Sequence, residues 1–212
     1  MTKIYFVRHC ESVANRDRII QGTKDFDISP EGESQLEALK ARFGKIHIDK
    51  IYSSPLTRTY KTALAIKGEK DVEIEKDIGF IEFNFGDIQG MHHETCQQTY
   101  PELYEVFKTH FYDMDAPGGE TYKHFYETVW TALQRVISEN KGKTVAIASH
   151  GGTIRALFTR LLFDDMTRVH DTSPVVNTAV FEVDFQDDGS FDIKMMNDDS
   201  HLNKKAAVRL EI

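Results

Sequence analysis

The feature that most constrains this chain is the alternation of short apolar runs with longer segments that carry apolar side chains at helical spacing. The runs that predict parallel strands are 3–7, 48–54, 72–76 and 144–149. The segments that predict helices are 30–43, 55–66, 121–139 and 153–163. A closing antiparallel hairpin is expected at 176–185 and 190–196. Strands that alternate with helices predict an α/β fold, a three-layer α/β/α sandwich with a mostly parallel central sheet.

A small helical cap insertion is expected on this sandwich. Residues 79–90 are rich in Gly and Phe without a clean period and are expected to form a loop. Residues 94–111 are expected to contain helical structure. We therefore expect a single domain over residues 1–212, with the cap insertion at about 91–117.

Reactive side chains stand where the expected parallel strands end. Arg8 and His9 follow the first strand, Arg58 the second, Glu82 the third and His150 the fourth. In open α/β sheets, ligands bind beyond the carboxyl ends of the strands. The sequence therefore predicts one site that gathers residues from four separate segments.

The overall charge limits the classes of ligand that the chain can bind. A net charge of −8 opposes binding to nucleic acid and to anionic lipid. No apolar run approaches the roughly 18 residues of a membrane-spanning helix. Cys10 and Cys96 are too few for a disulfide framework, which is typical of a reducing compartment. We expect a cytoplasmic monomer or homodimer that binds neither nucleic acid nor membrane.

The residue types at the predicted site suit phosphoryl transfer. This reaction needs in-line positioning and positive charge around the transferred oxygens, which Arg8, Arg58 and a second histidine can supply without a metal ion or cofactor. A neutral imidazole is a competent nucleophile when its other ring nitrogen is anchored. Glu82 lies among apolar residues and can protonate the leaving alkoxide. We expect His9 to be the nucleophile and Glu82 the acid.

Five segments of the sequence carry a family resemblance. They are RHCESVAN at 8–15, SSPLTRTYKTA at 53–63, IEFNFGDIQG at 81–90, PGGET at 117–121 and ASHGGTIRAL at 148–157. In this order they resemble the blocks of the histidine phosphatase superfamily, also called phosphoglycerate mutase-like. The resemblance covers about the whole chain, and the ordered set is far more specific than any single block.

The resemblance implies a role for each matched residue. His9 would be the phosphorylated nucleophile, and Arg8, Arg58 and His150 would hold the phosphoryl oxygens. Glu82 would act first as the acid and then as the base that activates water. The candidates for substrate binding are Asn15, which would contact the phosphate, and Ser12, Gln21, Gly22, Glu120 and Gly151. The implied function is a phosphomonoester hydrolase that acts on a small phosphorylated metabolite through a phosphohistidine.

The chain departs from the family pattern at two places. Cys10 stands where the family usually has Gly, which adds a side chain next to the expected phosphate pocket. Ile88 and Gln89 replace the Trp and Glu that are common after the Phe-Gly pair. Neither change removes a catalytic group.

The same segment contains a rival signature. His9, Cys10 and Arg16 satisfy HCx5R, which resembles the phosphate loop of cysteine-dependent tyrosine phosphatases. That loop cradles phosphate with backbone amides and usually needs Gly, whereas the intervening residues have no Gly and include Glu11. We therefore favour His9 over Cys10 as the nucleophile.

Two alternatives to hydrolysis are a phosphoglycerate mutase-type transfer and a non-catalytic phosphate-binding regulatory module. Residues 94–117 contain five acidic residues and only one basic residue, Lys108. An acidic cap disfavours a second anionic group on the substrate. The sequence therefore favours a phosphomonoester in which the part other than the phosphate is neutral. The complete set of catalytic residue types argues against a module without activity.

Two further clusters have simpler explanations. Tyr100, Tyr104, Phe107 and Phe111 have the spacing that an amphipathic helix needs merely to pack, and we expect core packing there. His92, His93, Glu94 and Cys96 lack a distant ligand pair that would complete a metal site.

Overall fold

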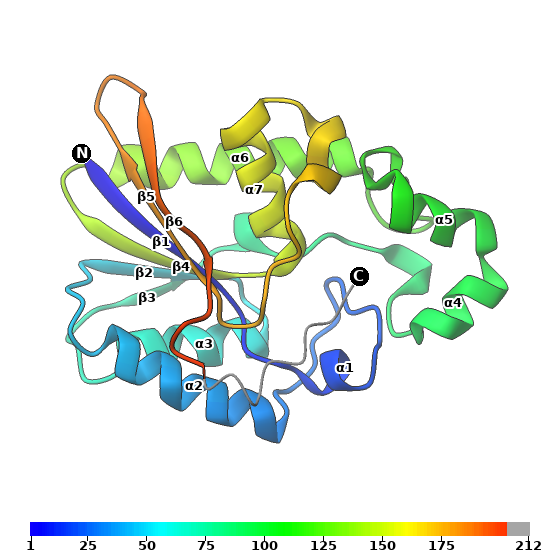
Figure 1. Ribbon diagram of the computed structural model, residues 1–212, viewed down its shortest axis with the longest axis horizontal. Coiled ribbons are helices and arrows are strands. Elements are labelled where there is room, and N and C mark those ends of the chain that lie inside the picture. The colour runs from blue at the N-terminus through cyan, green and yellow to red at the C-terminus, as the bar shows by residue number, and fades with distance from the viewer. Residues whose placement is uncertain (203–212) are drawn as a thin grey trace.

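The computed structural model describes residues 1–202 as a six-stranded sheet covered by helices on both faces (Figure 1). The strands are β1 (Thr2–Arg8), β2 (Lys50–Ser53), β3 (Ile74–Lys76), β4 (Thr144–Ser149), β5 (Val180–Phe185) and β6 (Phe191–Asp198). Their order is β3-β2-β4-β1-β5-β6, with the first four parallel and the last two antiparallel to their neighbours. The predicted α/β/α sandwich with a mostly parallel sheet is confirmed. Residues 203–212 of the predicted domain lie outside the described residues.

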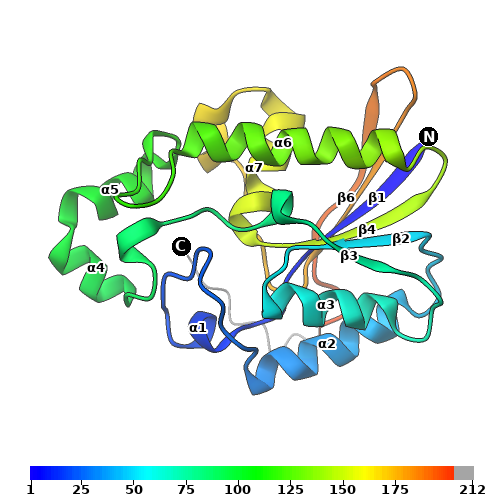
Figure 2. The same ribbon diagram turned by 180° about the vertical axis from the view of Figure 1, so that it is seen from behind.

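Two pairs of helices cover the two faces of the sheet. Figures 1 and 2 show α2 (Pro30–Phe43) and α3 (Thr57–Lys67) on one face, and α6 (Tyr122–Glu139) and α7 (Gly151–Phe163) on the other. Because successive side chains of a strand point to opposite faces, a central strand must be apolar throughout. In β1, Ile4 and Phe6 join the core cluster under α6 and α7, while Tyr5 and Val7 join the cluster under α2 and α3. This explains the unbroken apolar run that begins the sequence.

The ends of the two longest helices follow local capping rules. The Ser29 hydroxyl accepts a hydrogen bond from the Gly32 amide at 3.0 Å, and Pro30 occupies the first turn of α2. The Thr121 hydroxyl accepts from the His124 amide at 3.2 Å and begins α6. These polar caps fix the starts of the helices that the apolar spacing predicted.

Several predicted boundaries differ from the structure for identifiable reasons. The first predicted strand of the hairpin begins at Val180 rather than at 176, because β1 offers it partners only as far as the Val7–Val180 pair. The helix predicted from 55 begins at Thr57. The helix predicted from 153 begins at Gly151, directly after the extended residue His150.

The predicted helical stretch at 94–111 is divided. It forms α4 (His93–Thr99) and α5 (Pro101–Thr109), followed by the 3₁₀ turn η3 (Phe111–Asp113). Tyr100 leaves the helical conformation between α4 and α5, and Pro101 begins the new helix, where its missing N–H costs no hydrogen bond. Figures 1 and 2 both show α4 and α5 beyond the carboxyl ends of the parallel strands.

Short elements that the sequence did not predict surround the same edge of the sheet. They are α1 (Val13–Arg16), η1 (Ile78–Phe80), η2 (Gly86–Ile88) and η4 (Met166–Asp171). Each has fewer residues than the periodic pattern of an amphipathic helix requires, so no periodicity could predict it. Within residues 1–202, none of the helices combines the length and hydrophobicity of a membrane-crossing segment.

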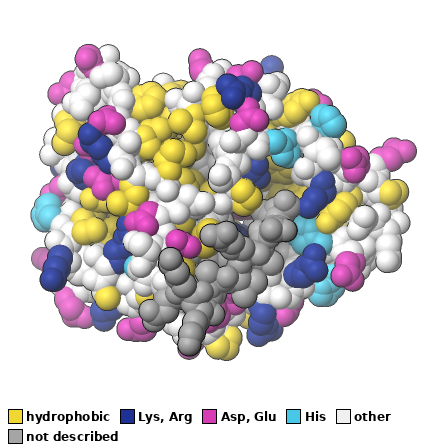
Figure 3. All heavy atoms as spheres, in the orientation of Figure 1, with side chains coloured by type: hydrophobic (Ala, Val, Ile, Leu, Met, Phe, Trp, Pro, Cys, Tyr) yellow, Lys and Arg dark blue, Asp and Glu magenta, His cyan; other side chains and the backbone are white. Residues whose placement is uncertain are grey.

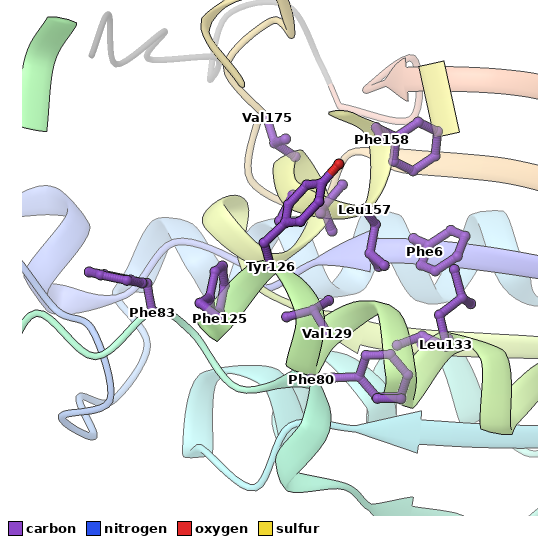
Figure 4. Packing of buried hydrophobic residues seen from close by; sticks show 14 of the residues in the cluster. Phe6, Phe80, Phe83, Phe125, Tyr126, Val129, Leu133, Leu157, Phe158 and Val175 are labelled. Carbon is purple, nitrogen blue, oxygen red and sulfur yellow. The ribbon is translucent and has the colours of Figure 1, made fainter. Parts of the chain in front are cut away.

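The core above the sheet is built on contacts between α7, α6 and β1. The Phe158 ring lies 5.7 Å from the Phe6 ring in an edge-to-face arrangement and 4.6 Å from the Phe181 ring. Figure 4 shows Leu133 of α6 and Leu157 of α7 pointing into the same region. This packing fixes α7, and therefore the residues at its start, against the end of the sheet.

We expect Phe158→Ala to lower the free energy of unfolding by about 3–5 kcal/mol, because the removed ring leaves a cavity in a packed interior. Urea unfolding followed by circular dichroism measures this value. The matched control is Leu162→Ala on the same helix, where the side chain is 41% exposed and the loss is expected to stay below about 1 kcal/mol. Equal losses in the two variants would contradict this account of the core.

Candidate active site

The pairing of β1 with β4 brings the two predicted histidines together. Arg8 lies opposite Ser149 in the parallel register, and the His9 amide donates to the Ser149 carbonyl at 2.8 Å. His9 and His150 therefore leave adjacent strands at the same level. Both side chains are buried, and their ring centroids lie 5.3 Å apart.

A cavity of about 150 Å³ lies at this edge of the sheet. The predicted residues that line it are Arg8, His9, Asn15, Gln21, Gly22, Arg58, Glu82 and Gly151. The predicted residues His150, Ser12 and Glu120 are not part of the lining, although the His150 ring lies 5.3 Å from that of His9. Residues predicted from five separate segments of the sequence thus meet around one small space.

Ser12 and Glu120 are placed to support residues that do line the cavity. The Ser12 hydroxyl donates to Gln21 Oε1 at 2.7 Å, and Ser12 also forms the capping pair with Asn15 at the start of α1. A Glu120 carboxylate oxygen accepts from the Asn84 amide at 2.8 Å, two residues beyond Glu82. Both side chains therefore act on the shape of the cavity from outside it.

One hydrogen bond sets the tautomer of His9. Its Nδ1 lies 2.6 Å from the carbonyl oxygen of Cys10, which can only accept, so Nδ1 carries the proton. Nε2 then holds the free electron pair, which is the form that can attack a phosphorus atom. Asn177 donates to the His9 carbonyl at 2.9 Å and fixes the backbone on the other side. His9 is thus held in a nucleophilic form by its own chain.

Burial and charge keep the His9 ring neutral. The loss of solvent, together with the guanidinium groups of Arg58 and Arg8, holds the pKa of His9 well below its ordinary value of 6.5. The hydrogen bond to the Cys10 carbonyl opposes this shift but does not reverse it. The same causes hold the pKa of His150 well below 6.5.

The two predicted arginines are fixed by backbone carbonyls and not by carboxylates. Arg58 donates from Nη1 to Lys24 at 2.9 Å and from Nη2 to Gly22 at 2.8 Å, and Arg8 donates from Nη1 to Val175. Burial lowers the pKa of each guanidinium to about 10, which leaves both charged at neutral pH. Carbonyl partners hold the geometry without neutralising the positive charge.

The cavity is surrounded by polar atoms that have no partner. Among the described residues, Nε of Arg8, Nε of Arg58 and Nδ1 of His150 are buried without a hydrogen bond. The hydroxyl of Ser54, 2.8 Å from His150 Nε2, can donate to that nitrogen and leave Nδ1–H as the donor. Unpaired buried donors are costly, and an anion with several acceptor oxygens would satisfy them. In residues 1–202, no three His, Cys, Asp or Glu side chains group to hold a metal ion.

Glu82 is held at the cavity wall by two backbone amides. Oε1 accepts from the Phe83 amide at 3.0 Å, and Oε2 accepts from the Gly152 amide at 3.1 Å, in the first turn of α7. A Cβ atom at Gly152 would come within 2.4 Å of Oε1. The second glycine of the ASHGG segment therefore makes room for this carboxylate.

The PGGET segment supports the loop that carries Glu82. The Asp87 amide donates to the Pro117 carbonyl at 2.8 Å. Gly86 has a positive φ of 52°, and a Cβ atom there would lie 2.0 Å from the Pro117 carbonyl oxygen. The two segments, far apart in sequence, are packed backbone to backbone. This contact fixes the position of the loop relative to the cap.

The structure does not support the rival cysteine mechanism. Cys10 is fully buried outside the cavity lining, and burial raises the pKa of its thiol to about 12. The reactive thiolate is therefore disfavoured. Arg16, which completes the HCx5R pattern, forms an exposed ion pair with Asp17 at 2.8 Å. The two residues do not share a phosphate loop.

The cavity also contains residues that sequence reasoning did not select. They are Ile19, Ile20, Phe85, His93, Phe107, Phe111, Gly152, Arg155 and Val175. Phe107 and Phe111 pack with other aromatic rings, as their spacing predicted, and line the cavity as well. The signal for Arg155 was its spacing: it stands four residues after Gly151 and so on the same face of the helix.

Comparison with known proteins gives a consistent result. The sequence profile of the histidine phosphatase superfamily (branch 1) matches residues 4–199. The chain is 32% identical over 207 residues to phosphoglycerate mutase-like protein 4 of Arabidopsis thaliana, covering 95% of this chain and 87% of that protein. It is 35% identical over 168 residues to phosphoserine phosphatase 1 of Hydrogenobacter thermophilus, covering 79% and 80%. The structure of Bacillus stearothermophilus YhfR shares the fold, with a TM-score of 0.90, 24% identity and coverage of 95% and 99%.

The shifted pKa of His9 predicts where its ring titrates. Because the folded-state pKa lies below 6.5, the ring loses its proton at lower pH and is neutral from about pH 6.5 upward. NMR titration of the imidazole C–H signals, with His9→Gln used to assign the His9 signal, measures this. We expect the His9 signal to stay constant between about pH 6.5 and 8. A midpoint inside that window would contradict the account.

Proposed function

The chain belongs to the histidine phosphatase superfamily, and from this premise we propose that it hydrolyses a compact phosphomonoester through a phosphohistidine at His9. The family establishes an enzyme of phosphoryl hydrolysis or transfer that acts on small phosphorylated substrates. Two observations support the roles that we propose. The His9 ring is neutral with Nε2 free, and Arg8, Arg58 and His150 each have a buried donor without a partner among the described residues. That set offers one nucleophile and a cradle for the oxygens that surround the attacked phosphorus.

In the first step, the electron pair of His9 Nε2 forms a bond to phosphorus while the ester P–O bond breaks. Glu82, at the cavity wall, gives its proton to the departing alkoxide. The donors of Arg8, Arg58 and His150 stabilise the charge on the phosphoryl oxygens. Nδ1–H keeps its bond to the Cys10 carbonyl, which stabilises the positive charge that develops on the ring.

In the second step, water attacks the phosphohistidine. Glu82, now ionised, accepts a proton from this water as the new P–O bond forms. The N–P bond breaks, its electron pair returns to Nε2, and inorganic phosphate leaves. The enzyme regains its starting protonation states, so one carboxyl group serves both steps.

The dimensions of the cavity support a small substrate. Its volume of about 150 Å³ lies below the roughly 300–1,000 Å³ of pockets that enclose drug-sized ligands. On the face shown in Figure 3, acidic and basic side chains are interspersed and form no continuous basic surface. The guanidinium groups of Arg8 and Arg58 line the cavity and supply the local positive charge that a phosphate site needs in a chain with a net charge of −8.

A mutase-type transfer is the second candidate, because one relative is named phosphoglycerate mutase-like. The two reactions share the phosphoenzyme and differ in whether water or a substrate hydroxyl attacks it. A kinetic comparison separates them: isomerisation of 3-phosphoglycerate faster than hydrolysis of any ester would replace the hydrolase proposal. A non-catalytic module is disfavoured because Arg8, His9, Arg58 and Glu82 line the cavity and the His150 ring lies 5.3 Å from that of His9, which gathers every group that the reaction needs.

We also propose, from the sequence, a single domain over residues 1–212 that acts as a monomer or homodimer in the cytoplasm. Cys10 and Cys96 are both buried and form no disulfide, which supports a reducing compartment. Light scattering after size-exclusion chromatography measures the assembly, and a trimer or larger species would contradict this expectation.

The identity of the nucleophile is tested by two neighbouring substitutions. We expect His9→Ala to reduce the release of p-nitrophenol from p-nitrophenyl phosphate at least about 10³-fold, because it removes the attacking nitrogen. Cys10→Gly is expected to retain turnover, because its side chain lies outside the cavity. Both are measured with excess chelator present. The reverse pair of results would assign the reaction to the thiol.

The double role of Glu82 is tested by Glu82→Gln, which keeps the shape of the side chain but cannot exchange a proton. With p-nitrophenyl phosphate, whose leaving group needs little protonation, we expect the phosphoenzyme to form and then persist, because water is no longer activated. Rapid-quench trapping of acid-labile phosphoprotein measures its amount. Steady-state hydrolysis is expected to fall about 10²-fold or more. Loss of hydrolysis without phosphoenzyme accumulation would restrict Glu82 to the first step.

A further inference from the structure

A third guanidinium group, that of Arg155 on α7, lines the cavity and has no part in the steps above. Its Nε donates to the Thr172 hydroxyl at 3.3 Å, and its Nη2 donates to the Val169 carbonyl at 2.8 Å. Both partners belong to η4 or the residue that follows it. The structure gives Arg155 Nη1 no hydrogen-bond partner among residues 1–202. The side chain is thus anchored on one side and open on the side that meets the cavity.

We propose that Arg155 binds a carboxylate on the alcohol part of the substrate, so that the preferred substrates are short phosphorylated acids. Phosphoserine is an example of this class, in which the phosphate and the carboxylate are separated by two carbon atoms. The inference rests on the proposed function, because it assigns the second half of the substrate in the same cavity.

The charges that face the cavity support this assignment. Three guanidinium groups and one carboxyl group, Glu82, line it, together with the histidines His9 and His93. In the first step Glu82 has to carry the proton that it gives to the alkoxide. Two of the guanidinium groups match the charge of a phosphate dianion, and the third remains to pair with a carboxylate of the substrate. An ester with a neutral remainder would leave one buried cation without a partner, which is unfavourable.

The acidic composition of the cap led us to expect a substrate whose alcohol part is neutral. The residues that line the cavity have a different charge from the cap as a whole. The acidic residues of the cap are Glu94, Glu102, Glu105, Asp113 and Asp115, and none of them lines the cavity. The cap contributes His93, Phe107 and Phe111 instead. The local field at the substrate therefore comes from the arginines.

The position of Arg155 suits the leaving-group side of the phosphate. Glu82 must reach the ester oxygen, and its carboxylate is bound to the amide of Gly152 in the first turn of α7. Arg155 stands three residues later on this helix, and residues three apart lie on one face. A group attached two carbon atoms beyond the ester oxygen would extend from Glu82 toward this side chain. The small volume of about 150 Å³ limits how far it can extend.

A matched pair of substrates isolates the carboxylate. O-Phosphoserine and O-phosphoethanolamine share the phosphate, the ester oxygen and the ammonium group, and differ in the carboxylate alone. We expect the unmodified protein to hydrolyse phosphoserine with a kcat/KM at least about tenfold higher. This factor is the size expected from one charge-assisted hydrogen bond. A preference for phosphoethanolamine would overturn the inference without any variant.

The assignment to Arg155 is tested by Arg155→Gln. We expect the ratio of kcat/KM for phosphoserine to that for phosphoethanolamine to fall at least about tenfold, mainly through a higher KM for phosphoserine. The control is Arg160→Gln, the same substitution on the same helix at a guanidinium that pairs with Glu127 and Asp164 and does not line the cavity. The control is expected to retain the ratio. Thermal melts of both variants show whether they fold.

The possible outcomes separate this inference from the proposed function. An equal loss for both substrates in Arg155→Gln would show a structural role and overturn the carboxylate assignment. A ratio that falls as far in Arg160→Gln would have the same meaning. Absence of His9-dependent phosphate release from any ester would instead refute the hydrolase itself.

Discussion

The parallel pairing of β1 with β4 at the centre of the sheet is the constraint on which the whole site depends. It places His9 and His150 side by side, and it buries both because the two strands have neighbours on each side. Burial removes water from the imidazole rings, which lowers their pKa and keeps them neutral. The nucleophilic form of His9 is therefore a consequence of strand order as much as of its immediate partners.

The same burial makes the cationic residues effective. Arg58 is fully buried, and its Nη groups are bound to carbonyl oxygens that carry no net charge. Placing such a cation in the interior destabilises the empty protein, because a charge without a counter-ion is poorly solvated there. An anionic substrate relieves that cost when it binds. The packing of Phe158, Phe6 and Phe181 supplies stability elsewhere, so that the fold tolerates an unfavourable arrangement at its functional edge.

The parts of the site that the sequence predicted are those fixed by strand ends. Arg8, His9 and His150 stand at the ends of β1 and β4, whose apolar runs could be recognised in the sequence, whereas the turn η1 separates Glu82 from the end of β3. Arg155 was missed because the relevant information is which face of α7 meets the cavity, and that depends on the packing of the helix. The charge of the cap differs from the charge of the cavity lining for a related reason. Composition reports how many acidic residues a segment has but not the direction in which their side chains point.

Backbone groups hold the Glu82 carboxylate in one position at the cavity wall. Its two oxygens accept from the amides of Phe83 and Gly152, and backbone amides do not change charge between the steps. These two neutral donors therefore fix the position of the group at the cavity wall in both steps of the proposed reaction. Glycine at position 152 belongs to the same arrangement, because a Cβ atom there would come within 2.4 Å of Oε1 and would displace the carboxylate from this position.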